Sequence, residues 1–360
     1  MAAREVTVQF EVPEVYRLVL QTGKDGVISE ARVEGEFISR QIGALIKARY
    51  TDPHKAIYVV ERLCGACSHA HTLAFASSVE KALGIGVPSR AAGMRVLGAE
   101  LERIQSHAYS LSEIAAAAGS HDVERSLWGI WQAVTAILAE LSGSRVHYGL
   151  NVIGGVTRDV SPGVLGTSKT KLAALRASVD GVRGEFSRVL GERLAGLGVW
   201  AAKGEGLPGT GPNQRASGSC RDIRKEPPYA LYGELAFGVP GREEGDCFAR
   251  ASVRLEEIVE SCRLAEGLLS GLPGGEIRAR EIDVAPDAPL TSAVSVEAPR
   301  GEDRHEVALT PTGEIRTLTI RVPTEDSLVG VAAALVGVRE PDARIVVASF
   351  DLCMSCFGGT

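Results

Sequence analysis

Two Cys-x-x-Cys pairs, far apart in a chain of 360 residues, are the side chains best suited to chemistry. Cys64 and Cys67 form the first pair, and Cys353 and Cys356 form the second, close to the C-terminal end. The thiolate is the metal-binding form of cysteine, and two thiols three positions apart can chelate one ion. The two pairs together predict a metal site with four thiolate ligands.

Three kinds of site fit four thiolates: a structural zinc, an iron–sulfur cluster, and a softer redox metal centre. Structural zinc usually joins pairs a couple of dozen residues apart, in domains too small to build their own core. Here 285 residues lie between Cys67 and Cys353. Zinc would add little to such a chain, so the spacing favours a buried reactive centre.

Side chains beside the pairs predict further members of the site. Arg62 supplies a cation that would favour an ionised thiol, and His71 follows the first pair on what should be the first turn of a helix. Asp351 lies just before the second pair. The competing interpretation is that Arg62 makes a structural ion pair and that His69 and His71 are ordinary capping or surface groups.

The composition is that of a soluble globular protein, with 45% hydrophobic and 23% charged residues and a formal charge of -6. This charge gives no reason to expect nucleic acid as a partner. The N-terminus is charged where a signal peptide needs an apolar stretch, and no segment approaches the ~18 apolar residues of a membrane span. We therefore expect a cytoplasmic protein whose seven cysteines are reduced.

The elements that must position these residues follow from the apolar periodicity. Residues 4–33 alternate apolar and polar side chains around a turn at 24–26, which predicts a small antiparallel sheet. Four long amphipathic helices imply a bundle, and Cys262 lies on the apolar face of the last one. We expect these helices to begin at Pro88-Ser89, after Ser120, near Thr167 and near Asp246.

The C-terminal part is predicted to be strand-like over 272–325, helical over Ser327–Leu335, and a buried strand over 344–350 that delivers Cys353. A Gly/Pro-rich stretch over 204–245 is too long for a simple connector and is expected to carry function. We expect one domain over 1–360 of the mainly α (α+β) class, a long-helix bundle with small peripheral antiparallel sheets. Its parts are an N-terminal sheet (1–35), a helical core (36–271) and a C-terminal irregular or β segment (272–360).

Two motifs carry a resemblance to a known family. Arg62-x-Cys-Gly-x-Cys-x-x-x-His71 and Asp351-x-Cys-x-x-Cys356 resemble the signatures of the large, catalytic subunit of nickel–iron hydrogenases. Other stretches resemble the membrane-associated, energy-converting branch of that family, which is similar to the quinone-site subunit of respiratory complex I. They include Ala99–His107, Asn151–Asp159, Gly209–Gly218, and Val296–Gly301 with His305. The complex I relatives lack the cysteines, so the four thiols favour the hydrogenase branch, although Leu352 replaces a proline of the family motif.

The resemblance implies the large-subunit fold of these hydrogenases and a centre of nickel and iron, with carbon monoxide and cyanide on the iron. Cys64 and Cys353 would be terminal ligands of nickel, and Cys67 and Cys356 would bridge nickel and iron. The substrates would be dihydrogen and protons. The electrons need a partner, expected to be a small subunit with an iron–sulfur cluster, because this chain has no further cysteines in a cluster-binding pattern. Further membrane-arm subunits would place the chain on the inner face of the cell membrane.

Splitting dihydrogen needs a Lewis acid for the hydride and a base for the proton. By the resemblance, Arg300 lies over the metals, held by Asp351 through charge-assisted hydrogen bonds, and either Arg300 or Cys353 is the base. Arg62, His71 and Arg300 are the expected contacts of the centre. A carboxylate with a raised pKa should accept the departing proton. Its candidates are Glu11, Glu14, Glu34 and Glu36.

Two other functions remain alternatives. A related reductase could use the same thiolate cage on sulfur compounds, and a complex-I-like quinone-site subunit could carry unused cysteines. Weaker candidates have structural alternatives as well. His107 fits a hydrogen-bonded core residue equally well. A last group of three residues could support the site or a partner contact, and it fits a structural ion-pair network equally well. That group consists of Arg215, Asp222 and Arg224.

Overall fold

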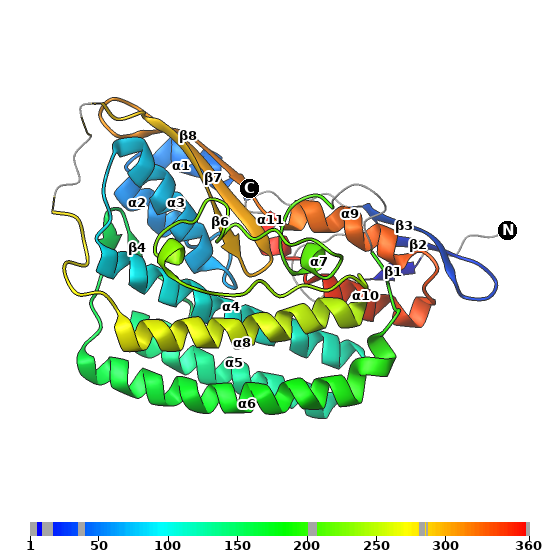
Figure 1. The fold of residues 1–360 in the computed structure, drawn as a ribbon. Coiled ribbons are helices and arrows are strands. Elements are labelled where there is room, and N and C mark those ends of the chain that lie inside the picture. Colours follow the sequence, from blue (N-terminus) through cyan, green and yellow to red (C-terminus); the bar gives the residue numbers. More distant parts are fainter. Residues whose placement is uncertain are drawn as a thin grey trace.

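Four long helices form the lower layer of the molecule in Figure 1 and pack side by side. The computed structural model describes residues 6–8, 17–34, 40–200, 207–280, 285 and 287–357. Helix α4 packs against α5 and α8, and α6 packs against the same two helices. The predicted bundle is confirmed, with α4 (Ser89–Ala117), α5 (His121–Ser142), α6 (Pro162–Leu194) and α8 (Cys247–Gly271).

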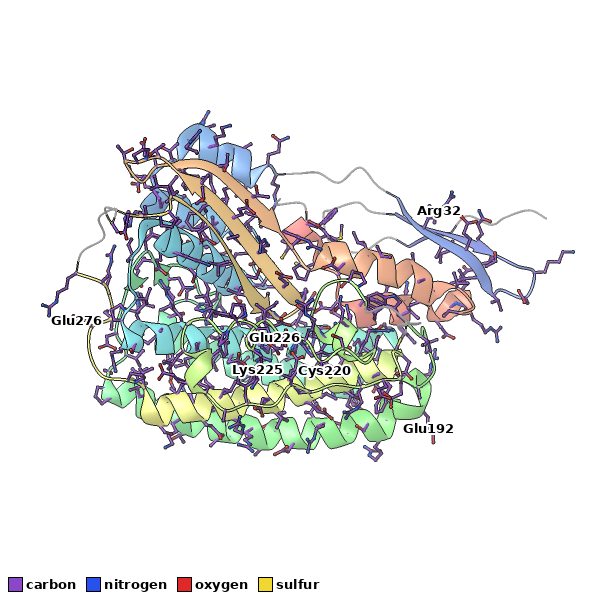
Figure 2. All side chains as sticks on the ribbon, turned by 45° about the horizontal axis from the view of Figure 1, so that its top comes forward. Arg32, Glu192, Cys220, Lys225, Glu226 and Glu276 are labelled. Atoms are coloured by element: carbon purple, nitrogen blue, oxygen red, sulfur yellow. The ribbon has the colours of Figure 1, made fainter. Side chains whose placement is uncertain are left out.

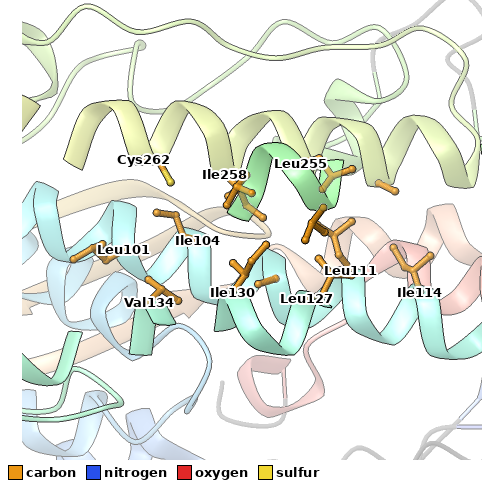
Figure 3. Packing of buried hydrophobic residues seen from close by; sticks show 14 of the residues in the cluster. Leu101, Ile104, Leu111, Ile114, Leu127, Ile130, Val134, Leu255, Ile258 and Cys262 are labelled. Carbon is orange, nitrogen blue, oxygen red and sulfur yellow. The ribbon is translucent and has the colours of Figure 1, made fainter. Parts of the chain in front are cut away.

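The apolar faces read from the sequence meet inside this bundle (Figure 3). Leu101 and Ile104 of α4, Ile130 of α5, and Ile258 and Cys262 of α8 belong to one buried cluster. Cys262 is therefore a core residue, as predicted.

Polar caps set where the helices begin. Asp246 caps α8 by accepting a hydrogen bond from the Ala249 N–H at 2.7 Å. The sequence predicted that the third long helix begins near Thr167, but α6 already begins at Pro162. Ser161 caps it there, and Pro162 fits the first helical position.

A second layer lies above the bundle in Figure 1 and holds short helices and a sheet. The helices are α1 (Ile42–Arg49), α2 (Pro53–Val60) and α3 (Ser68–Leu83). The strand-like segment forms an antiparallel sheet in the order β6-β7-β8, and α3 packs on β6 and β7. The strands are β6 (Thr291–Ala298), β7 (Gly301–Leu309) and β8 (Ile315–Arg321), with a separate small pair of β4 (Asn151–Val152) and β5 (Gly155–Val156).

The predicted N-terminal sheet forms at the far end of the molecule, beside helix α9 (Thr324–Leu335) (Figure 1). Its antiparallel order is β1-β2-β3, and the predicted turn at 24–26 joins the last two strands. The strands are β1 (Val6–Val8), β2 (Arg17–Thr22) and β3 (Ile28–Glu34). The mainly α class with small antiparallel sheets is confirmed.

The prediction of a buried strand over 344–350 is wrong, because the segment is helix α10 (Ala343–Phe350). A short apolar run cannot be assigned to strand or helix from periodicity alone, and packing against α4, α8 and α9 selects the helix here. The chain then turns at Asp351, which has a φ of 53°, and enters α11 (Met354–Phe357). Shorter elements are α7 (Pro212–Arg215) and the 3-10 turns η1 (Tyr232–Glu234) and η2 (Glu340–Asp342).

Among the described residues, every helix is too short or too polar to cross a membrane.

Candidate metal centre

The two Cys-x-x-Cys pairs meet in the interior. Cys64 and Cys67 lie in the turn between α2 and α3, and Cys67 is the residue that precedes the first turn of α3. Cys353 follows α10, and Cys356 lies in α11. All four side chains are buried.

The sulfur atoms contact one another across the pairs. The Sγ atoms of Cys64 and Cys353 are 3.4 Å apart, and those of Cys67 and Cys356 are 3.1 Å apart. Both distances exceed the ~2.05 Å of a disulfide bond, and the cysteines are free. All four sulfurs lie within 4.8 Å of one another, so the set can hold a metal, and soft sulfur donors suit a soft transition metal.

The thiols differ in their readiness to ionise. The pKa of Cys353 is held well below its usual range, although burial would raise it. The largest cause is hydrogen bonding from the other three thiols, first that of Cys356, and the positive charge of Arg300 adds to it. Hydrogen bonding to Cys353 and burial raise the pKa of Cys67 and of Cys356. Of Cys353, Cys67 and Cys356, Cys353 is therefore the thiol that its surroundings most favour in the ionised form.

Arg300 and Asp351 are brought together at the second pair, as the resemblance implied. Arg300 donates through Nε to the Asp351 carbonyl at 3.0 Å and through Nη2 to its Oδ1 at 2.8 Å. A third bond runs from Nη1 to the Ser106 Oγ at 3.1 Å. Burial would lower the pKa of Arg300, but Asp351 and the neighbouring thiols, among them Cys353, raise it well above its usual value. The guanidinium is thus a fixed cation beside the sulfurs.

His71 reaches the thiols from α3. Its Nε2 lies 3.4 Å from the Cys356 Sγ and 3.7 Å from the Cys67 Sγ, and its Nδ1 lies 2.9 Å from Asp303 Oδ2. Burial acts to lower the pKa of His71, but the Asp303 carboxylate and the nearby thiolates raise it to about 9. His305 also contacts Asp303, at 3.4 Å. The imidazole of His71 is therefore held between a buried carboxylate and the sulfurs.

Arg62 does not join the site, so its predicted place beside the thiols is wrong. Its guanidinium pairs with Glu61, bonds the Tyr58 carbonyl at 2.7 Å, and lies over the Tyr148 ring at 4.9 Å from the centroid. The side chain is 56% exposed. Arg62 follows the pattern of the competing interpretation, a structural ion pair, while His69 and His71 are both buried rather than on the surface.

Arg40 was not found from the sequence, where a lone arginine carries no signal. Its guanidinium donates to the carbonyls of Arg62 at 3.2 Å and Leu63 at 2.5 Å, and also to that of Ser355. One side chain therefore ties the turn before Cys64 to the turn that holds Cys356.

We expect Arg40→Ala to loosen this connection and weaken metal retention by about 10- to 100-fold, the usual effect of losing a group that supports metal ligands. Metal content would be measured after dialysis against a graded series of chelator concentrations. The matched control is Arg49→Ala, an exposed arginine at the end of α1. Equal retention in the two variants would contradict the role given to Arg40.

Glu102 is a second residue that sequence reasoning missed. It accepts hydrogen bonds from the backbone N–H groups of His69 at 2.8 Å and Ala70 at 3.0 Å, at the N-terminus of α3. Burial raises the pKa of Glu102 to about 7, although these two bonds oppose the rise. It therefore caps the helix that begins at Cys67.

Because the pKa of Glu102 rises from 4.5 to about 7 on folding, the folded chain binds a proton more tightly than the unfolded chain between these values. Stability should therefore fall as pH rises from 4.5 to 7, by about 3 kcal/mol from this group. Glu102→Gln should remove that part of the slope in denaturant unfolding of the metal-free chain. Exposed Glu314→Gln is the control, and unchanged slopes in both variants would refute the assignment.

The other sequence candidates fall into three groups. His107 is a buried core residue whose Nε2 lies 2.8 Å from Glu257. Arg215, Asp222 and Arg224 of the long polar segment form a buried ion-pair network. Arg215 pairs with Glu257 and Glu297, and Arg224 pairs with Asp222 and Glu100. Because these side chains are buried in the chain, they do not form a surface for a partner. Of the carboxylate candidates, Glu11, Glu14 and Glu36 lie outside the described residues, as does the side chain of Glu34.

Two family models match the chain. Residues 40–116 match the model described as nickel-dependent hydrogenase, and residues 127–293 match that of the respiratory-chain NADH dehydrogenase 49 kDa subunit. The first match contains the first cysteine pair, and the second covers most of the long-helix bundle.

Whole proteins show the same double likeness. The membrane-bound hydrogenase subunit alpha of Pyrococcus furiosus is 32% identical over 83% of this chain and 74% of that relative. A subunit of the NADH-quinone oxidoreductase of Carboxydothermus hydrogenoformans is 28% identical over 94% and 93% of the respective chains. A chain in the structure of the membrane-bound sulfane sulfur reductase, an archaeal respiratory membrane complex, superimposes with a TM-score of 0.89 and 25% identity. The superposition covers 99% of this chain and 98% of that one.

Proposed function

Because this chain belongs to the family that joins nickel-dependent hydrogenases to the 49 kDa subunit of respiratory NADH dehydrogenase, we propose that it is a hydrogenase catalytic subunit. It would interconvert dihydrogen with protons and electrons at a nickel–iron centre whose iron carries carbon monoxide and cyanide. One observation carries the proposal: four buried thiols from two distant pairs meet within 4.8 Å. The sulfur contacts join Cys64 to Cys353 and Cys67 to Cys356. In the proposed centre Cys64 and Cys353 would hold nickel, and Cys67 and Cys356 would be shared between nickel and iron.

The bound centre would supply a soft Lewis acid for dihydrogen. The chain's own groups then handle the proton. In the proposed centre the Cys353 sulfur would accept it, and Arg300 offers a fixed cation beside the developing charge. Asp351 and Ser106 hold that guanidinium in place. His71 contacts the sulfurs of Cys67 and Cys356 through Nε2, while its Nδ1 pairs with Asp303.

The electron partner we propose is a small subunit with an iron–sulfur cluster, accompanied by further subunits that hold the complex at the inner face of the cell membrane. Relatives named as subunits of membrane-bound complexes support this assembly.

Metal analysis with an activity assay tests the proposal. The native complex should contain about one nickel and one iron per chain and reduce a dye with dihydrogen. The likeness to the sulfane sulfur reductase favours one second candidate, reduction of sulfur compounds in the same cage. A complex that reduces polysulfide but not dye with dihydrogen would support it. Nickel-free protein from nickel-fed cells would instead support a complex-I-like subunit with unused cysteines.

A further inference from the structure

A cavity of about 620 Å³ lies beside strand β6, apart from the site described above. Its walls come from α3 and the turn after it, from the start of α4, from residues 221–230, and from β6 and β7. Figure 2 labels Glu226, one of the lining residues, in the segment between the sheet and helix α8. None of the four clustered cysteines lines this cavity, so it needs an explanation of its own.

Strand β6 has a free edge, because the sheet order leaves it paired with β7 alone. At Glu297 the backbone points away from β7: its N–H donates to the Tyr229 hydroxyl at 3.0 Å, and its carbonyl accepts from Arg103 at 2.6 Å. Residues of an antiparallel strand alternate between bonding their neighbour and facing away. The backbone groups of Ser295 and Ala293 therefore also face away from β7, and both residues line the cavity.

These outward groups have no turn, loop or side-chain partner within the described part of the chain. Two N–H groups and two carbonyls of Ala293 and Ser295 thus face an open cavity at a strand edge. Such an edge is a template for an added strand, which gains main-chain hydrogen bonds without rearranging the sheet.

The charged groups favour one kind of added strand. On the cavity floor Glu80 and Arg95 neutralise each other through bonds of 2.9 and 2.6 Å. Around them, three exposed cations face two carboxylates, of which Glu302 already accepts a bond from the Ser295 hydroxyl at 2.5 Å. The cations are Lys81, Arg221 and Arg304, and the second carboxylate is Glu226. Arg304 already pairs with Glu306 at 3.7 Å, whereas Lys81 and Arg221 have no ion-pair partner in the described part of the chain, so carboxylates of an added strand would pair with these two.

We propose that this cavity is the docking groove for an extended acidic segment of another subunit, which adds to β6 as a fourth strand. The segment bonds the free backbone groups of Ala293 and Ser295, and its carboxylates meet Lys81 and Arg221 at the rim. The proposal rests on assembly into a multi-subunit complex and is independent of the metal chemistry.

Hydrogen exchange at single-residue resolution tests the added strand, comparing the purified native complex with the full chain alone. In the chain alone, the Ala293 and Ser295 amides should exchange rapidly, while the Val294 amide, which faces β7, is protected. In the complex, the Ala293 and Ser295 amides should slow by about 100-fold. Unchanged exchange of both amides on assembly would overturn the proposal whether or not the complex oxidises dihydrogen.

A carbodiimide, which couples an amine directly to a carboxylate, identifies the occupant. We expect Lys81 to be coupled to an Asp or Glu of a different subunit, and Lys81→Arg to abolish that product while keeping the charge. Coupling of Lys81 to a second copy of this chain, or no product at Lys81 in the intact complex, would overturn the choice of partner.

Charge reversal gives an independent measure. Lys81→Glu should make the complex dissociate at lower salt, because it replaces attraction to the acidic segment with repulsion. Lys169→Glu, at an exposed position on α6, is the matched control and should dissociate at the same salt concentration as the unaltered complex. Identical behaviour of both variants would contradict the acidic occupant.

Discussion

Cys353→Ser is expected to lose its nickel and to lower hydrogen-dependent dye reduction by at least about a thousandfold. A serine hydroxyl is a hard donor that stays protonated near neutral pH, and it would replace a soft thiol whose pKa is held well below its usual range. The buried sulfur of Cys64, 3.4 Å away, loses its partner at the same time. Nickel content by mass spectrometry and the dye assay are measured on the same preparation.

The chain provides its own control for this substitution. Cys220 is exposed and lies in the polar segment outside the sulfur cluster, so Cys220→Ser should keep both metal and activity. A Cys353→Ser complex with full nickel and full activity would show that the four thiols do not form the centre. Loss of both properties in Cys220→Ser as well would point to a general effect of removing a thiol.

Arg300→Lys is expected to lower dihydrogen turnover by about 100-fold while the metals remain bound. Lysine keeps the positive charge, but it cannot make the three bonds that fix the guanidinium to Asp351 and Ser106. The cysteines are untouched, so metal content separates this variant from Cys353→Ser. The exposed Arg316→Lys is the control. Full activity in Arg300→Lys would mean that a positive charge alone suffices.

Residue spacing was enough to find the sulfur cluster and the bundle. The Cys-x-x-Cys pairs are recognisable as metal-binding motifs from their spacing alone. The apolar residues that include Leu101 and Ile258 repeat at helical spacing, so the buried face of each helix can be read from the sequence. The contact between Arg300 and Asp351 also followed, although from family resemblance rather than from spacing.

Contacts between distant segments could not be predicted in this way. Arg62 is next to the first pair in sequence, yet its side chain is exposed and contacts Glu61 and Tyr148. Arg40 is distant in sequence, but it donates hydrogen bonds to carbonyls near both pairs. The buried carboxylate of Asp303 acts on His71 only because β7 packs against α3. Packing likewise decided that 344–350 is helical, since its apolar run fits either element.

An infrared spectrum of the purified native complex tests the central claim most directly, because carbon monoxide and cyanide bound to metal absorb where proteins do not. We expect such bands in the unaltered complex, and we expect Cys353→Ser to abolish them while Cys220→Ser leaves them in place. A complete complex without these bands, holding zinc or no metal between its four thiols, would contradict that claim.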